Sequence, residues 1–223
     1  MSLKKSIFPL ALSGVLSLNI VGCSTSMNYT PPLEIRESQT VILRDPFEAA
    51  WTKSVRALGD SFFVINNLVK DSKIINLSYS GDPEKYVDCG HLMINVKQGI
   101  GSTTYEFPAA RRSVKYKLVR GFTTTFVDRQ MSLESRINVL FEEVDRNETG
   151  VKIVVRYVVT RTGTQTVIDH FSNRTSTLPL PPLSFSFNTG GSDSATAEST
   201  STCRPTGAME KAIIDLLTLP YTQ

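Results

Sequence analysis

The stretch SRINVLFEEVDRNETGVKIVVRYVVT, residues 135–160, decides the fold. Its two halves, 135–144 and 151–160, are rich in the β-branched and aromatic residues that favour strands. The polar segment Arg146-Asn147-Glu148-Thr149-Gly150 separates them by a hairpin-like interval. Residues 153–159, IVVRYVV, are almost continuously apolar, as is typical of a central strand with both faces covered. We therefore predict an antiparallel hairpin at the centre of a sheet.

Further strands are predicted on both sides of this stretch. Residues 114–119, 121–127 and 164–173 are also rich in β-branched residues, and Arg161-Thr162-Gly163 is interpreted as the turn before the last of them. The segments 62–65 and 74–79 indicate an earlier hairpin.

Two helices are predicted to cover this sheet. Phe47, Ala50, Trp51 and Leu58 recur at helical spacing, and Asp45 before Pro46 is a typical start for a helix over 46–58. A similar apolar stripe predicts a helix over 207–218. The predicted fold class is α+β, a curved antiparallel sheet packed by these two helices. It forms one domain, residues 39–223, with a flexible low-complexity loop at 188–202.

The N-terminus has the three parts of an export signal. Lys4 and Lys5 precede an apolar run over 7–21, which at about 15 residues is shorter than the roughly 20 that span a bilayer as a helix. Ile20-Val21-Gly22-Cys23 then resembles the lipobox of bacterial lipoproteins. The resemblance implies that residues 1–22 are a signal peptide, that cleavage occurs before Cys23, and that acyl chains modify its thiol and new amine. The alternative is an ordinary cleaved signal, or an uncleaved helix with an incidental cysteine.

The same resemblance implies a location. Ser24, rather than an aspartate, follows the cysteine, which in this family implies lipid anchoring at the periplasmic face of the outer membrane. Residues 23–38, with Pro31-Pro32, are interpreted as a lipidated spacer. The predicted order of elements is also similar to that of helix-grip envelope lipoproteins, such as the accessory lipoprotein of the outer-membrane β-barrel assembly machinery. That likeness is one of fold only and carries over no functional residue.

Charge argues against a nucleic-acid partner. The chain has 24 Lys and Arg against 21 Asp and Glu. Removal of Lys4 and Lys5 with the signal leaves 22 basic residues and a net charge of +1. A chain so balanced has no general attraction for nucleic acid.

Two cysteines remain after lipidation, Cys89 and Cys203. An oxidising exported compartment favours a disulfide between them. The alternative is a metal site that adds His91 to the two thiols. Its short Cys-x-His spacing and the missing fourth ligand argue against it, so we predict no metal.

We find no catalytic constellation and predict no cofactor. Asp169 and His170 are adjacent, so on a strand their side chains point to opposite faces. No Gly-x-Ser-x-Gly motif is present. A hydrolase would require His91 or His170 beside a carboxylate in a polar pocket.

A basic cluster of Arg111, Arg112, Lys115 and Lys117 has two interpretations. It is either the polar face of strand 114–119 or a site for an anionic partner such as peptidoglycan or phospholipid headgroups.

These observations favour a non-catalytic envelope lipoprotein, held to the membrane through its N-terminal lipid and acting as an interaction or assembly module with an envelope protein partner. The alternative is a periplasmic binding protein for a small apolar or glycan ligand between sheet and helix. A cavity lined by Trp51, Phe63 and Tyr79 would favour that alternative.

Overall fold

A computed structural model describes residues 23–34, 39–196 and 200–219. In chain order its elements are β1 Ser24–Thr30, β2 Thr40–Leu43, α1 Phe47–Gly59, β3 Val64–Val69, β4 Ile74–Gly81, β5 Val87–Asp88, β6 His91–Gln98, β7 Gly101–Pro108, β8 Ser113–Arg120, β9 Thr123–Asp145, β10 Glu148–Asp169, β11 Arg174–Pro179, β12 Leu183–Asn188, β13 Asp193–Thr196, β14 Thr200–Pro205 and α2 Ala208–Thr218.

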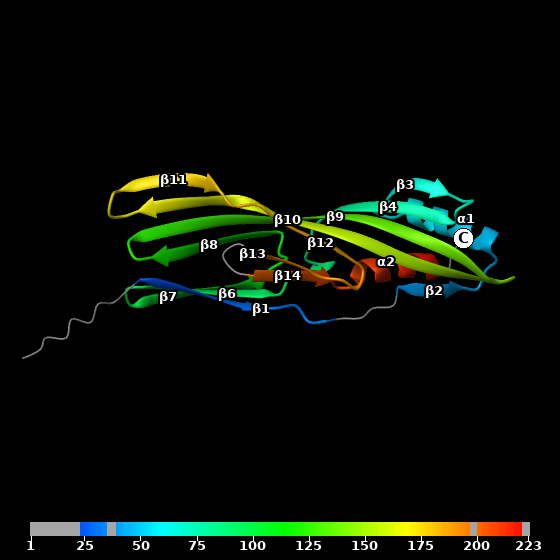
Figure 1. The fold of residues 1–223 in the computed structure, drawn as a ribbon, viewed down its shortest axis with the longest axis horizontal. Coiled ribbons are helices and arrows are strands. Elements are labelled where there is room, and N and C mark those ends of the chain that lie inside the picture. The colour runs from blue at the N-terminus through cyan, green and yellow to red at the C-terminus, as the bar shows by residue number, and fades with distance from the viewer. Residues whose placement is uncertain (1–22, 35–38, 197–199, 220–223) are drawn as a thin grey trace, which may run out of the picture.

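A single long hairpin runs the length of the molecule (Figure 1). Strands β9 and β10 have 23 and 22 residues and pair antiparallel from Asp145–Glu148 to Thr123–Asp169. At about 3.3 Å per residue, each strand extends roughly 70 Å. The hairpin predicted from residues 135–160 is therefore confirmed, and it is about twice as long as that stretch suggested.

The predicted turn at Arg161-Thr162-Gly163 is wrong. Gly163 remains in β10 and pairs with Arg129 of β9. Its φ is +148°, and a Cβ there would lie 2.1 Å from the carbonyl oxygen of Asp128. This glycine therefore permits close approach of two strands instead of reversing the chain.

Shorter strands share the two edges of the hairpin. Strand β4, with β3 outside it, pairs with the part of β9 near the hairpin turn, and β8 pairs with the part near its open end. Along β10, strands β2, β12 and β11 follow one another from the turn to the open end. Several strands are needed on each edge because one short strand could not pair with all of its backbone N–H and C=O groups.

Two small sheets complete the strand layers, β1-β6-β7 and β13-β14-β5. The first lies beneath β8 at the open end of the hairpin (Figure 1). The Thr25 hydroxyl joins the two layers, because it donates to the Val119 carbonyl at 2.9 Å and accepts from the Val119 N–H at 2.8 Å.

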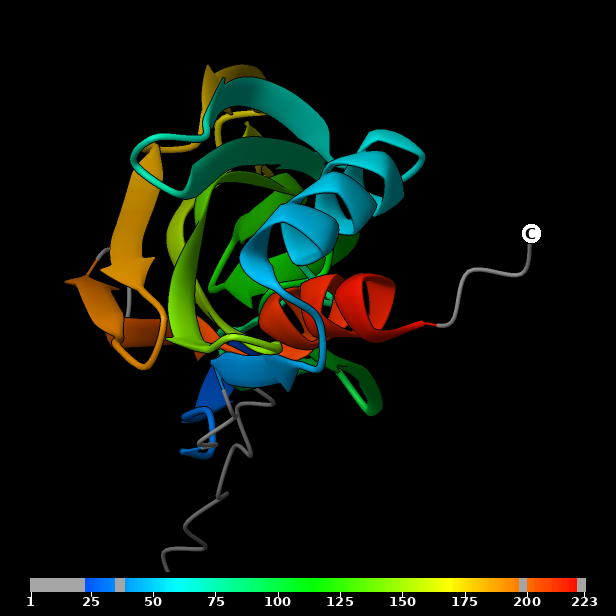
Figure 2. The ribbon, with the colours of Figure 1, turned by 90° about the vertical axis from the view of Figure 1, so that its right-hand side faces the viewer.

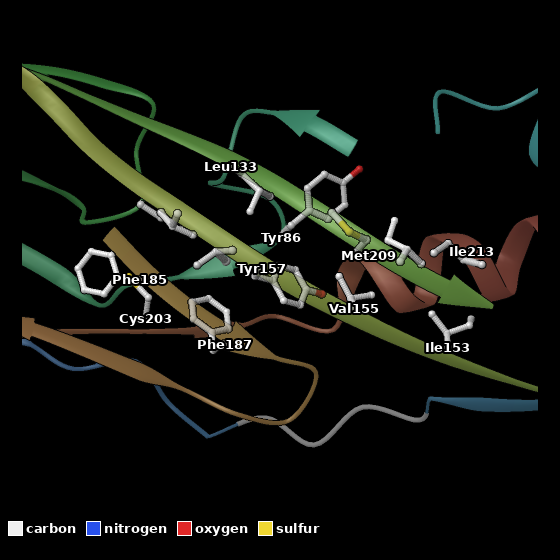
Figure 3. Packing of buried hydrophobic residues seen from close by; sticks show 14 of the residues in the cluster. Tyr86, Leu133, Ile153, Val155, Tyr157, Phe185, Phe187, Cys203, Met209 and Ile213 are labelled. Atoms are coloured by element: carbon white, nitrogen blue, oxygen red, sulfur yellow. The ribbon is translucent and has the colours of Figure 1, made fainter. Parts of the chain in front are cut away.

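The core lies on one face of the hairpin. Alternate side chains, including Ile137 and Val139 of β9 and Ile153 and Val155 of β10, are buried. Near the hairpin turn they pack under α1 and α2. Figure 3 shows Ile153 and Val155 beside Met209 and Ile213 of α2, and the end-on view of Figure 2 shows both helices on one side of the curved sheet.

The predicted α+β fold class is wrong, because strands hold 62% of the described residues and helices only 13%. The two helices exist close to the predicted ranges 46–58 and 207–218, but they cover one end of the hairpin only. The β1-β6-β7 and β13-β14-β5 sheets supply the covering layers that we did not predict.

Two segments expected to lack regular structure form strands instead. Part of the predicted spacer 23–38 is β1, which pairs with β6 from Ser24–Lys97 to Thr30–His91. Within the predicted loop 188–202, β13 and β14 pair as a hairpin. Segments rich in Ser and Thr suggest polar loops from sequence. Here their backbones form strands because the edges of neighbouring strands supply hydrogen-bond partners.

The start of α1 also differs from the prediction. Pro46 is the N-cap and forms no side-chain cap, whereas the Asp45 carboxylate binds the Lys53 ammonium at 2.8 Å. Gly207 caps α2 with a left-handed φ of 79°.

A buried polar contact attaches α2 to the hairpin. The Glu210 carboxylate is almost fully buried and accepts hydrogen bonds from the Tyr157 hydroxyl and the Thr189 hydroxyl, both at 2.8 Å. Burial and the neighbouring negative charge of Glu210 raise the pKa of Tyr157. The phenol therefore stays a donor at every physiological pH.

We expect Tyr157→Phe to lower the free energy of unfolding by about 1–3 kcal/mol, because the buried carboxylate loses a donor that water cannot replace. Tyr105→Phe is the control, since Tyr105 is half-buried and its hydroxyl forms no hydrogen bond with any residue that the structure describes. Urea unfolding followed by circular dichroism measures both variants. Equal midpoints for the two would show that this contact does not attach α2.

Candidate functional site

Three exposed apolar side chains lie in turns at the open end of the hairpin. Ile100 is fully exposed in the β6–β7 turn, Phe122 is 72% exposed in the β8–β9 turn and Phe171 is 84% exposed in the β10–β11 turn. The rings of Phe122 and Phe171 lie 6.3 Å apart, and the His170 N–H donates to the Phe122 carbonyl at 3.0 Å. We call Ile100, Phe122 and Phe171 the apolar tip.

Cys23 lies at the same end of the molecule. It directly precedes β1, whose first residue Ser24 is paired with Lys97 close to the β6–β7 turn. Its thiol is free and half-buried. The predicted lipidation residue and the apolar tip are therefore neighbours, whereas both helices lie at the opposite end (Figure 1).

Basic residues accompany the apolar tip. Lys97, Arg120 and Arg174 are exposed at the ends of β6, β8 and β11. The nearby Asp169 carboxylate is committed to its own turn, where it accepts from the Ser172 hydroxyl at 2.7 Å and the Phe171 N–H at 2.9 Å. These hydrogen bonds lower the pKa of Asp169 and fix the turn that presents Phe171.

A second candidate surface is a groove of about 800 Å³ on the outer face of the hairpin, away from the core. Its floor carries Arg136 and Arg156 directly opposite each other on β9 and β10, with Glu134 beside them. One wall is apolar, formed by Phe62, which is 55% exposed, and Val64. Like charges placed opposite each other on a sheet are unfavourable for stability, although water screens this exposed pair.

The predicted anionic-partner residues are spread along β8 and its approach. Arg111 lies 3.5 Å from the Glu84 carboxylate, Lys115 lies 3.0 Å from that of Asp128, and Lys117 donates to Gln98. Hydrogen bonds from Lys115 and Gln130 lower the pKa of Asp128. The positive charges of Arg111 and Lys115 are thus partly compensated, and Arg112 is exposed at the start of the strand.

The disulfide between Cys89 and Cys203 is confirmed. It joins β14 to the segment just after β5 across a sequence separation of 114 residues, and both cysteines are buried. Both thiols are consumed, so the alternative metal site with His91 is wrong.

The two histidines lie apart on the surface. The His91 ring is 3.8 Å from the Glu106 carboxylate on an exposed strand face, and the His170 ring shares a hydrogen bond with the Thr124 hydroxyl. Within residues 23–34, 39–196 and 200–219, no group of three metal-ligating side chains converges.

Of the three residues predicted to line a sheet–helix cavity, Trp51 and Phe63 belong to the core. Trp51 is buried against Phe141, with ring centroids 5.4 Å apart, and Phe63 is buried beside Tyr79. Tyr79, which is only partly buried, also lines the groove on the outer face.

Sequence reasoning missed both the apolar tip and the groove. A signal for the tip was available, because Ile100 stands between two glycines and Phe122 follows Gly121. A large apolar side chain in a short turn at the end of a hairpin cannot reach the core and is therefore exposed. The groove had no such signal, since the pairing of Arg136 with Arg156 depends on strand register.

Neither α1 nor α2 is long and apolar enough to cross a membrane, and no other helix is present in the part of the chain described. Comparison with known proteins finds no match to this chain, whether among family models, curated proteins or solved structures.

Proposed function

We propose that this chain is a non-catalytic lipoprotein of the cell envelope, anchored through acyl chains on Cys23 at the periplasmic face of the outer membrane, and that it acts as an interaction or assembly module. The observation that carries the proposal is the apolar tip beside Cys23. A lipid anchor and exposed aromatic side chains at one end of an elongated molecule favour attachment by that end.

The tip has the chemistry of a membrane contact. Each large apolar side chain transferred out of water contributes about 1.5–3 kcal/mol when fully buried, and each Lys or Arg near an anionic bilayer adds about 1 kcal/mol. One acyl chain alone binds only marginally. Acyl chains at Cys23 and the side chains of the tip would therefore reinforce each other and orient the long axis away from the bilayer.

Lipidation at Cys23 is tested by intact mass spectrometry of the membrane-extracted protein beside Cys23→Ala. We expect the mass of residues 23–223 plus acyl chains, with a rise of two hydrogens on reduction of the Cys89–Cys203 bridge. The variant should lack the acyl mass. An unmodified, full-length chain would contradict the anchoring proposal.

Membrane contact by the tip is tested without the lipid, on residues 23–223 carrying Cys23→Ser. We expect this chain to float with vesicles that contain anionic phospholipid, and Phe122→Ser with Phe171→Ser to weaken binding about tenfold or more, because two apolar anchors are lost. Phe62→Ser is the matched control, since Phe62 is similarly exposed but lies in the groove. Equal flotation of the tip variant and the control would remove the tip from the proposal.

The groove is the surface proposed for an envelope protein partner. Its opposed arginines favour carboxylates, and its Phe62–Val64 wall favours apolar side chains, so an extended partner segment bearing both suits it. Such a segment would offset the repulsion between Arg136 and Arg156. The groove also lies well away from the proposed bilayer contact, which leaves it open to the periplasm.

We expect Arg136→Glu with Arg156→Glu to reduce co-purification of this partner from crosslinked membranes at least tenfold. Lys152→Glu with Arg146→Glu, an equal double charge reversal at exposed positions outside the groove, should leave it unchanged. Quantitative mass spectrometry compares the three proteins. A partner lost equally with both charge reversals would be bound by net charge and not by the groove.

A further inference from the structure

A second feature lies inside the molecule, between the hairpin and the strands packed on its inner face. A small cavity of about 40 Å³ is lined by Arg129 of β9 and Arg161 of β10. The rest of its wall is mostly apolar and includes Met27, Leu92, Phe185 and the Cys89–Cys203 bridge. Two guanidinium groups at one apolar cavity are unusual, because buried charges are normally paired.

Arg129 is only 4% exposed, and two of its nitrogens, Nε and Nη2, are buried without a hydrogen-bond partner. Its guanidinium lies over the Phe107 ring at 5.1 Å, a contact that holds the side chain in place but leaves the in-plane N–H groups unused. Burial lowers the pKa of Arg129 to about 10; the nearby Tyr116 phenol opposes this shift, and the positive charge of Arg161 adds to it. The group is therefore still a cation at neutral pH.

Arg161 also has a buried nitrogen without a hydrogen-bond partner. It lies opposite Met131, so its side chain shares the inner face with that of Arg129, two residues along the sheet. One of its terminal nitrogens donates to the Pro181 carbonyl at 3.2 Å, but its Nε is also buried and unpartnered.

No carboxylate of the described residues compensates these charges. The nearest in sequence, Asp128, points to the opposite face of β9, where it binds Lys115 and Gln130. An unpaired buried cation such as Arg129 is strongly unfavourable, and the half-buried Arg161 beside it adds repulsion. Planar N–H groups aimed at the same cavity are the recognition element for a small anion.

We infer that the cavity between Arg129 and Arg161 binds a small monovalent anion, of the size of chloride or a single carboxylate group. The volume exceeds the 10–15 Å³ that one water requires, and it is too small for a sugar acid or a phosphate ester. Its largely apolar wall favours a weakly hydrated monoanion over a strongly hydrated divalent one. The ion would join the long hairpin to the layer that the Cys89–Cys203 bridge holds over it.

The test is thermal unfolding of the full chain in nonionic detergent, at constant ionic strength, with sodium gluconate replaced stepwise by sodium chloride or sodium formate. Gluconate is too large to enter. We expect the midpoint of the wild type to rise by about 3 °C or more as the small anion saturates the site. Line broadening of chloride-35 NMR, measured on the same samples, should report binding directly.

Arg129→Met should abolish both signals, and its midpoint in gluconate should equal or exceed that of the wild type, because an unpaired buried charge has been removed. Arg146→Gln, in the exposed turn between β9 and β10, should retain the wild-type response. If Arg129→Met fails to fold, Arg161→Gln serves instead and should weaken the response.

The inference is overturned if the wild-type midpoint is the same in all three salts, or if Arg129→Met matches the wild type in its midpoint response and in the chloride-35 line width of the chloride series. These readouts need neither bilayer nor partner protein. Failure here would therefore leave the membrane proposal standing, and the reverse also holds.

Discussion

The constraint on which the structure depends is the length of the β9–β10 hairpin. Two strands of more than twenty residues place a long, mostly apolar row of side chains on one face, interrupted on β9 by Ser135 and Arg129, and each row must be removed from water. Neither of the two helices is long enough to cover it. The chain therefore covers the face in sections, with α1 and α2 near the hairpin turn and the β1-β6-β7 and β13-β14-β5 sheets toward the open end. The disulfide holds the second of these sheets together, where few apolar side chains could do so.

This arrangement separates the two ends of the molecule. The helix end buries its polar contact, Glu210 with Tyr157, and is a region of dense packing. The open end exposes Ile100, Phe122 and Phe171 to solvent. This exposure is unfavourable in water, and these side chains contribute nothing to core packing. Between the ends, the outer groove and the inner arginine cavity lie on opposite faces of the same strands. The features without a folding rationale are therefore the ones from which function is inferred.

Two of these features place like charges close together. Arg136 opposite Arg156 and Arg129 beside Arg161 each bring like charges together, the first pair in solvent and the second in the interior. The first pair is screened by water and costs little. The second is not screened, and the low polarity of its surroundings makes an anionic counterpart far more valuable there. The same residue type thus supports a partner surface outside and an ion site inside.

Local pattern determined several features by itself. The hairpin turn near Arg146, the two helices, the strand at 113–120 and the disulfide are all recognisable in the sequence, because each depends on short-range spacing or on the number of cysteines left to pair. Tertiary structure alone decided the fold class, since the Ser- and Thr-rich segments of β1, β13 and β14 become strands only when a neighbouring edge accepts their backbone hydrogen bonds. It also decided that Gly163 continues a strand, that Phe122 meets Phe171, and that Arg129 is buried without a partner. These outcomes depend on strand register over more than twenty residues, which local composition does not encode.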